Sequence, residues 1–334
     1  MSASEMAEQG QGNKLTKEER ARLLLIKQAF PQNAFFIFNQ ATEFVTEADD
    51  IEGHDLLEKM LHSILFLGNI NAAKYPPDVI FVDREIYDKS KKAFPKPFDR
   101  YNSHVPLRTP FSYLLELIVR YYGAHEEEEE NDQEKEERVK AILCEILNGC
   151  KKSGIQYPLI SSVISICHVS NRRYYGGSLT CPGEIERQIM TAVSCLHVWH
   201  SYVSSAVLGV FPEDTTEARF PEGDINLPES VVCRAYDIEN LREVKPPCML
   251  CHELYSLPEH THNRNKPGNC AETEAISSLL KYEERVKRET TMKGSVLRKD
   301  EIKKRMSAYF DSKMNDRMSE RGNRDIYDIN KIYD

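Results

Sequence analysis

The sequence lacks any apolar run long enough to cross a membrane as a helix. Its longest apolar stretches, residues 112–119 and 191–199, are well short of the roughly 20 residues that such a helix needs. The first 25 residues also lack an apolar segment behind a basic start, so the sequence predicts no secretory signal. We therefore expect a cytoplasmic or nuclear protein that does not interact with membranes.

Several common catalytic signatures are missing as well. The chain contains no GxSxG motif, no HExxH motif, no phosphate-binding P-loop and no internal repeat. A nucleophile pair of cysteine and histidine is not excluded by these absences, because its members need to be adjacent only in space.

The chain also lacks an overall excess of basic charge. Its 44 basic and 53 acidic residues give a net charge of −9, which argues against a nucleic-acid grip by the whole molecule. Residues 281–305 are an exception, with ten Lys or Arg and five Asp or Glu. This segment could contact a nucleic-acid backbone, but a solvated helix with i,i+4 ion pairs is the favoured interpretation.

The composition is that of an ordinary globular protein. Hydrophobic residues make up 40% of the 334 positions and charged residues 29%, and the length favours two domains. In the absence of an export signal, the nine cysteines should be reduced. They therefore favour packing, metal binding or catalysis over a disulfide framework.

Residues 15–125 predict a mostly helical N-terminal region behind a disordered leader, residues 1–14. A first helix is expected over 15–30, with Thr16 and Glu19 in capping-box position. Apolar spacing predicts further helices over 49–74 and 112–123. Residues 78–83 predict a short strand, and residues 94–111 a proline-rich loop. These helices are a candidate surface for a protein partner.

The predicted boundary to a second domain is an acidic linker, residues 126–138. The second domain covers residues 139–290, and a charged tail, residues 291–334, follows it. The domain alternates helices and strands, which predicts an α/β fold in three layers with a mixed sheet. Helices are expected over 139–154 and 183–203, and strands over 157–170, 172–182, 204–211 and 229–238. The end of the tail, residues 311–334, shows no apolar periodicity and is expected to be flexible or docked on a partner.

The most informative stretch is a cysteine window. Cys248 and Cys251 form a CxxC motif at the predicted start of one helix, and Cys270 stands at the start of the next. Three thiolates that meet at two helix N-termini could hold one Zn²⁺ and leave its fourth position open for water. Glu272, two residues after Cys270, could then transfer a proton from that water to a leaving group.

These motifs resemble the paired signature of the zinc-dependent cytidine and nucleic-acid deaminase superfamily. Cys270-Ala271-Glu272 resembles its first half and Pro247-Cys248-Met249-Leu250-Cys251 its second half, in reversed chain order. Cys181 and Glu184 are three positions apart and do not replace the first half. The resemblance implies a deaminase-like α/β domain with Cys248, Cys251 and Cys270 as zinc ligands and Glu272 as the proton carrier. It also implies hydrolytic deamination of a cytosine- or adenine-type base, in a nucleotide or a nucleic acid.

Other interpretations of the window remain open. The zinc could be structural, with His252, His260 or His262 as a fourth ligand, in a protein that acts as a non-enzymatic interaction module. The fold could be a degenerate deaminase that binds nucleotides without chemistry. The cysteines could also be buried without a metal, and Glu272 could simply complete a helix cap with Asn269.

Two further groups are weaker candidates. Arg172, Arg173, Tyr174 and Tyr175 could stack on and clamp a nucleotide, although an ordinary strand end explains them slightly better. His168, His197 and His200 lie in apolar segments. Such histidines are more often buried and hydrogen-bonded than ligands, although His197 and His200 could share a helix face.

Overall fold

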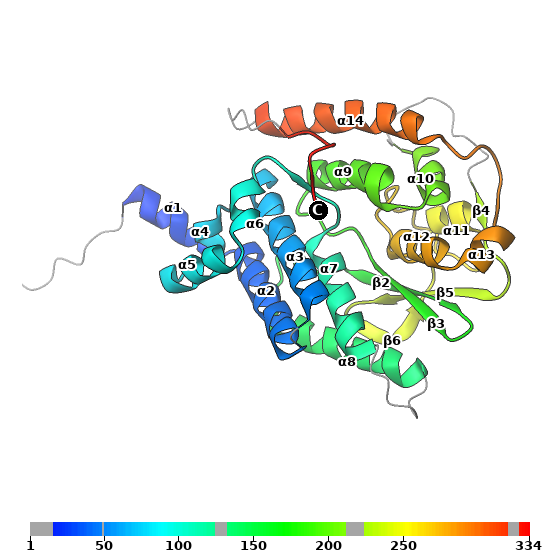
Figure 1. Ribbon diagram of the computed structural model, residues 1–334, viewed down its shortest axis with the longest axis horizontal. Coiled ribbons are helices and arrows are strands. Elements are labelled where there is room, and N and C mark those ends of the chain that lie inside the picture. The colour runs from blue at the N-terminus through cyan, green and yellow to red at the C-terminus, as the bar shows by residue number, and fades with distance from the viewer. Residues whose placement is uncertain (1–15, 49, 124–131, 212–223, 320–326) are drawn as a thin grey trace, which may run out of the picture.

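A computed structural model describes residues 16–48, 50–123, 132–211, 224–319 and 327–334 (Figure 1). The predicted disordered leader lies outside the described residues, as do residues 126–131 of the predicted acidic linker. Within the described ranges, no helix combines the length and the apolar character that a membrane span requires.

The N-terminal region is helical, as its apolar spacing predicts. Its elements are α1 (Lys17–Ile26), α2 (Ala29–Ala48), α3 (Ile51–Ile70), α4 (Pro77–Ile80), α5 (Arg84–Ala93), α6 (Pro95–Arg100), β1 (Val105–Pro106), α7 (Pro110–Ile118) and a π-helix (Val119–Gly123). The capping box of α1 is confirmed, because Thr16 and Glu19 each accept a hydrogen bond from the other's backbone N–H. α3 lies at the centre and contacts α2, α6 and α7.

Two predictions in this region are wrong. Residues 78–83 do not form a strand, because α4 begins at Pro77 and the side chains of Val79 and Ile80 are buried from a helical turn. Residues 94–111 are not all loop, because α6 and α7 begin at Pro95 and Pro110. Proline is favourable at the first position of a helix, so here it starts helices instead of marking a loop.

The C-terminal part contains helices and a four-stranded sheet. Its elements are α8 (Asp132–Gly149), β2 (Val163–Val169), β3 (Arg172–Gly177), α9 (Glu184–Val193), a π-helix (Ser194–Val198), α10 (Ser201–Leu208), β4 (Ile225–Asn226), β5 (Val231–Asp237), β6 (Asn240–Lys245), α11 (Met249–Tyr255), α12 (Ala271–Tyr282), α13 (Glu284–Glu289), β7 (Thr291–Met292), α14 (Lys299–Ser319) and β8 (Ile332–Tyr333). The chain is therefore a mixed α/β protein. The predicted strands 157–170 and 172–182 are present in shorter form as β2 and β3, which pair as an antiparallel hairpin.

The sheet has the order β3-β2-β5-β6 and carries α12 against one face. The sequence predicts a mixed sheet, but all three pairings within this sheet are antiparallel. The other face of the sheet meets α8. There Glu136 of α8 forms an ion pair with Arg173 (3.0 Å), and the imidazole of His168 lies 3.3 Å from the same carboxylate. Residues 132–138 of the predicted acidic linker thus belong to a helix that packs on the sheet.

The predicted strand 204–211 is helix α10. Val203, Ala206 and Val207 are spaced by three and four residues and are completely buried, so the Val-rich run is one face of a helix. Its N-terminus is capped by the imidazole of His200, which accepts the N–H of Tyr202. A short apolar run of this kind fits a strand or a helix equally well until its neighbours are known.

The tail is not free of apolar periodicity. α14 buries Ile302, Met306, Phe310, Met314 and Met318, one residue in every four, and packs along α9 (Figure 1). Further on, β8 pairs in parallel with β1 of the N-terminal region, and Tyr333 stacks on His62 with 3.9 Å between the ring centroids. The prediction of a flexible tail is thus wrong for the described residues, which dock on the same chain.

Candidate metal centre

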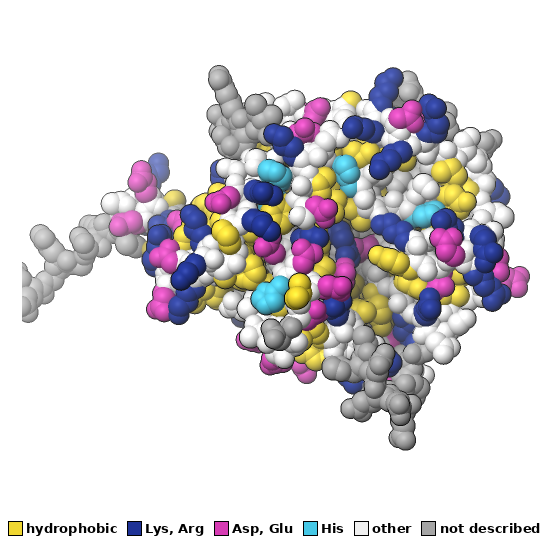
Figure 2. All heavy atoms as spheres, viewed as in Figure 1, with side chains coloured by type: hydrophobic (Ala, Val, Ile, Leu, Met, Phe, Trp, Pro, Cys, Tyr) yellow, Lys and Arg dark blue, Asp and Glu magenta, His cyan; other side chains and the backbone are white. Residues whose placement is uncertain are grey.

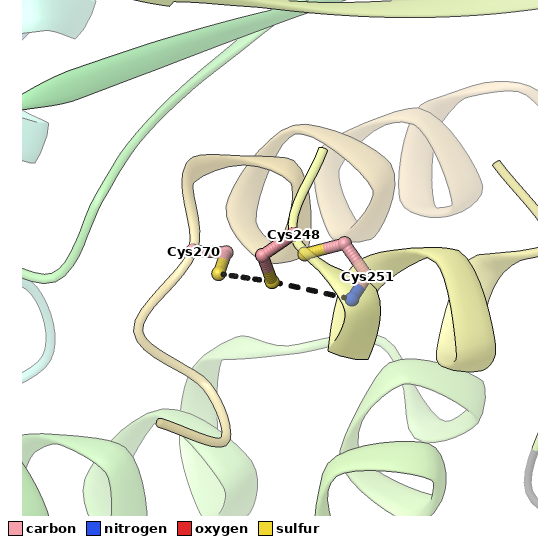
Figure 3. Close-up of side chains that lie close together, drawn as sticks. All are labelled: Cys248, Cys251 and Cys270. Atoms are coloured by element: carbon pink, nitrogen blue, oxygen red, sulfur yellow. Dashed lines mark hydrogen bonds between the residues drawn. The ribbon is translucent and has the colours of Figure 1, made fainter. Parts of the chain in front are cut away.

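Three cysteine sulfurs from two helix starts come together in the C-terminal part (Figure 3). The sulfurs of Cys248, Cys251 and Cys270 all lie within 4.8 Å of one another, and those of Cys248 and Cys270 are 3.5 Å apart. The predicted convergence of these three residues is therefore present. A group of this kind can hold a metal ion.

The local structure explains why the sulfurs converge. Cys248 and Cys270 occupy the N-cap positions of α11 and α12, where a side chain points back toward the open N–H groups of the first turn. The Cys251 N–H donates to the sulfur of Cys248 at 3.5 Å. The two helix starts are thus arranged so that their positive ends face the same sulfur cluster.

The loop between the two helices closes around the cluster. The Met249 N–H donates to the carbonyl oxygen of Asn263, and the Thr261 N–H donates to that of Pro247, both at 2.9 Å. The side-chain amide of Asn265 donates to the Cys270 sulfur at 3.4 Å. N–H donors to a thiolate stabilise its charge, so the loop favours the form of cysteine that binds metals.

The three thiols share charge unequally. Hydrogen bonds from Cys251 and Cys270 lower the pKa of Cys248 to about 2, while donation to Cys248 raises the pKa of the other two thiols. Cys248 is therefore the thiol of the cluster that most readily gives up its proton. A divalent cation that binds all three sulfurs would displace the protons that remain on them.

Glu272 lies in the first turn of α12 beside this cluster. Its side chain is buried, and its carboxyl group is close enough to feel the charge of Cys248. Burial, followed by the charge of Cys248, raises its pKa to about 7. A carboxyl group with such a pKa can both accept and release a proton near neutral pH.

Among the described residues, no histidine or carboxylate completes the cluster as a fourth ligand. The imidazole of His252 bonds to the carbonyl oxygen of Leu257, and His260 packs against His252 with 4.4 Å between ring centroids. His262 lies next to His260. The three histidines thus contact one another and are not part of the sulfur cluster.

Two residues that the sequence analysis did not single out fix the position of α12. A methyl group added at Gly176 of β3 would clash with the backbone nitrogen of Ala275 and lie 2.6 Å from the carbonyl oxygen of Ala271. Only glycine therefore lets the first turns of α12 approach the sheet this closely. The pair Gly176-Gly177 in the sequence was the available signal, since a glycine inside a strand often marks a close approach.

Glu274 is the second such residue. Its carboxylate accepts the backbone N–H of Gly177 at 2.8 Å, the hydroxyl of Ser112 at 3.1 Å and the guanidinium of Arg108 at 3.1 Å. These bonds tie the start of α12 to β3 and to α7 of the N-terminal region. The sequence offered no signal for them, because all three partners are distant along the chain.

Two of the four predicted clamp residues, Arg172 and Tyr174, lie at the other end of α12. Arg172 and Tyr174 both bond to Glu283, which follows the last turn of that helix, and Arg173 faces α8 and pairs with Glu136. A helix of this length spans about 18 Å, so these side chains are not placed to contact a base held at the cysteines. Tyr175 lies on the same strand, opposite Ile166 of β2.

The other candidate residues also lie apart from the cluster. His197 bonds to the carbonyl oxygen of Ile329, and His200 caps α10, so the two do not form a shared ligand pair. His168 is part of the ion-pair group around Glu136. Cys181 lies in a groove described below, and burial raises its pKa.

The predicted basic segment forms α13 and the start of α14. Its basic side chains pair with acidic neighbours on the same elements, for example Arg285 with Glu289 (2.9 Å) and Arg305 with Glu301 (2.7 Å). On the face drawn in Figure 2, Lys and Arg are interspersed with Asp and Glu. This arrangement agrees with the favoured interpretation of a solvated helix with i,i+4 pairs.

Two hollows lie near the centre. A cavity of about 10 Å³, room for about one water molecule, is lined by Cys270, Leu179 and Trp199 among others. A groove of about 830 Å³ lies on the other side of Leu179 and reaches Asn269, the neighbour of Cys270. The Leu179 N–H donates to the carbonyl oxygen of Asn269 at 2.9 Å. Leu179 and Asn269, joined by this bond, therefore separate the groove from the small cavity.

No protein-family description, no curated protein and no solved structure matches this chain.

Proposed function

We propose that Cys248, Cys251 and Cys270 bind one Zn²⁺ and that Glu272 serves this centre as the proton carrier of a hydrolytic deaminase. The observation that carries the proposal is the convergence of three sulfurs at two helix starts, one of which has a buried carboxyl group in its first turn. Three cysteines without a fourth described ligand correspond to a centre with one open position, which is typical of catalytic zinc.

The choice of zinc follows from the donor set. Thiolates are soft ligands that select Zn²⁺ over Mg²⁺ or Ca²⁺, which prefer oxygen. The N–H donors of Cys251 and Asn265 support the negative charge that three thiolates would place around the ion. Such donors outside the ligand set typically strengthen metal binding.

When bound, Zn²⁺ would supply a water molecule of lowered pKa as the nucleophile. Glu272 would take a proton at its carboxylate and donate it to the departing amino group, which leaves as ammonia. Its burial beside Cys251 excludes competing water from that carboxyl group. The substrate class is a cytosine- or adenine-type base, whose ring carbon exchanges an amino group for a carbonyl oxygen.

The groove of about 830 Å³ is the candidate approach for the base. Its size suits a nucleotide, and Leu179 contributes to its wall and to that of the small cavity at Cys270. Access to the centre requires Leu179 or the loop at Asn269 to move aside. A nucleotide or a single-stranded nucleic acid with an unstacked base would fit this approach.

The test combines metal content with ammonia release. We expect the purified full chain to hold one zinc, Cys270→Ala to lose it, and Glu272→Gln to keep it. Against a panel of cytosine and adenine nucleosides, nucleotides and single-stranded oligonucleotides, Glu272→Gln should lower ammonia release at least about a hundredfold, the scale of lost acid–base catalysis. Glu284→Gln, an exposed change on α13, is the matched control.

Zinc in the wild type without release from any of these substrates, or equal rates for wild type and Glu272→Gln, would contradict the enzymatic proposal. A specific observation favours a second function in that case. All three cysteines are at most 7% exposed, as in a structural centre that fastens α11 to α12. The protein would then be an interaction module without deaminase activity, and zinc removal would unfold it.

A further inference from the structure

Two more cysteines face each other in the middle of the sheet, outside the metal cluster. Cys167 of β2 lies directly opposite Cys233 of β5, and their sulfurs are 3.0 Å apart. Both are free thiols. Neither has a role in the proposed function.

The position of the pair in the ladder suits a covalent bond. The pairing of β2 with β5 ends at Val163 and Asp237, and the next two residues, Ser162 and Ile238, lie opposite each other. The Ile238 N–H donates to the carbonyl oxygen of Ser162 at 2.9 Å, so Ser162 and Ile238 form a hydrogen-bonded pair. The two types alternate along an antiparallel ladder, so Cys167 and Cys233, five positions on, form a non-hydrogen-bonded pair. Cα atoms in such pairs are about 4.5 Å apart, within the range that a disulfide spans.

The two thiols differ in access. Cys167 is completely buried, whereas Cys233 is partly exposed. Burial and donation to Cys233 raise the pKa of Cys167, so this thiol stays protonated and donates to the Cys233 sulfur. A soluble oxidant therefore reaches Cys233 first, with Cys167 in place behind it.

We propose that Cys167 and Cys233 form a reversible disulfide by exchange with a low-molecular-weight disulfide such as glutathione disulfide. The Cys233 thiolate attacks one sulfur of the small disulfide, forms a mixed disulfide and releases one small thiolate. Cys167 then loses its proton and attacks the Cys233 sulfur, which releases the second small thiolate. The small disulfide is reduced to two thiols that take up the two protons, and the two protein thiols are oxidised.

The bond would lie beneath the helix that carries the metal centre. α12 covers this part of β2 and β5, and the charge of Glu272 contributes to the raised pKa of Cys167. The oxidised pair would fasten the two central strands under the first turn of α12. This inference does not rest on the proposed function, because it concerns the thiols of the sheet alone.

The experiment incubates the full chain with glutathione disulfide, blocks the remaining thiols with an alkylating agent after denaturation and maps the cysteines by mass spectrometry. We expect peptides with Cys167 and Cys233 joined, a loss of two hydrogen atoms from the protein mass for this bond, and recovery of both thiols with dithiothreitol. Cys144, exposed on α8, should carry glutathione and so report that the oxidant acted.

Two variants separate the roles of the thiols. Cys167→Ser should accumulate glutathione on Cys233 several-fold over the wild type, because the second attack is lost. Cys233→Ser should leave Cys167 free of glutathione. If Cys167 and Cys233 stay free thiols in the wild type while Cys144 is fully modified, the proposal is overturned, and this result does not depend on whether either variant folds.

Discussion

The N-terminal helices and the starts of α11 and α12 both bury side chains. The N-terminal helices bury apolar ones, whereas α11 and α12 bury thiols and a carboxyl group where they begin. α3 buries a continuous apolar face that includes Leu61, Ile64 and Leu65, each without solvent exposure. α11 and α12 begin instead with three buried thiols and a buried carboxyl group, from Cys248 to Glu272. Two parts of one chain thus bury different kinds of side chain away from water.

The two kinds of buried side chain have different consequences, one for the stability of the fold and the other for function. Removing apolar side chains from water stabilises a fold by about 25 cal/mol for each Å². Removing an ionised carboxyl group or a thiolate from water is unfavourable unless partners compensate for the lost hydration. The apolar face of α3 is therefore explained by folding alone, while the polar cluster needs a further reason, which a bound metal would supply.

The comparison is most strongly tested by deleting part of the apolar face. Leu61→Ala should lower the free energy of unfolding by about 4 kcal/mol, because it leaves a cavity at a fully buried site. Metal content per folded molecule should stay unchanged. Urea unfolding and metal analysis measure the two quantities, and Leu24→Ala, at a position 66% exposed on α1, should change neither. If Leu61→Ala stays folded but loses its metal, metal binding depends on the packing of α3, and the two regions do not have separate roles.

Gly176→Ala tests the other region. The added methyl group meets the backbone of α12 and cannot avoid it by rotation, so we expect a loss of about 3 kcal/mol in unfolding free energy. The first turn of α12 should also shift, which would weaken metal binding in a titration. The matched control is Gly123→Ala, where the added atom would be 3.4 Å from Val139, an ordinary contact. Unchanged metal affinity in Gly176→Ala would show that this contact does not position the centre.

Acid should weaken the docking of the tail on α3. Burial lowers the pKa of His62 to about 3, below its value of about 6.5 in the unfolded chain. The contribution of this histidine is complete above pH 6.5 and is lost as the pH falls from there toward 3. At pH 5 the loss should reach about 2 kcal/mol.

The measurement is urea unfolding of the wild type and two variants at pH 7 and pH 5. His62→Phe keeps an aromatic ring against Tyr333 but cannot be protonated, so it should lose less stability on acidification. His54→Phe, on the exposed side of the same helix, should behave like the wild type. An equal acid sensitivity of all three proteins would refute the assignment to His62.

The smallest expected effect concerns the cap of α1. Thr16→Ala removes the side-chain acceptor for the Glu19 N–H and should destabilise this helix by about 1 kcal/mol. Hydrogen exchange of the α1 amides should speed up, while the metal centre is unaffected. Thr46→Ala, which removes an exposed hydroxyl from within α2, serves as the control. Faster exchange throughout the molecule in Thr16→Ala would mean that the cap supports more than its own helix.

Sequence patterns predicted the elements whose signals are local. The cap at Thr16, the hairpin of β2 and β3, and the helix starts at Cys248 and Cys270 each depend on residues within a few positions of one another. Sequence patterns failed where a short apolar run fits both a strand and a helix. Residues 204–211 are such a run, and the structure places helix α10 there. Burial of Val203 against neighbouring helices decided that case.

The sequence by itself determined that three cysteines and a glutamate stand at helix starts, because capping and spacing are properties of short segments. Only the tertiary structure decided that the sulfurs meet, that Gly176 admits α12 and that Cys167 faces Cys233. The physical reason is distance along the chain. Contacts between segments tens of residues apart depend on how the whole core packs, and no local pattern records that packing.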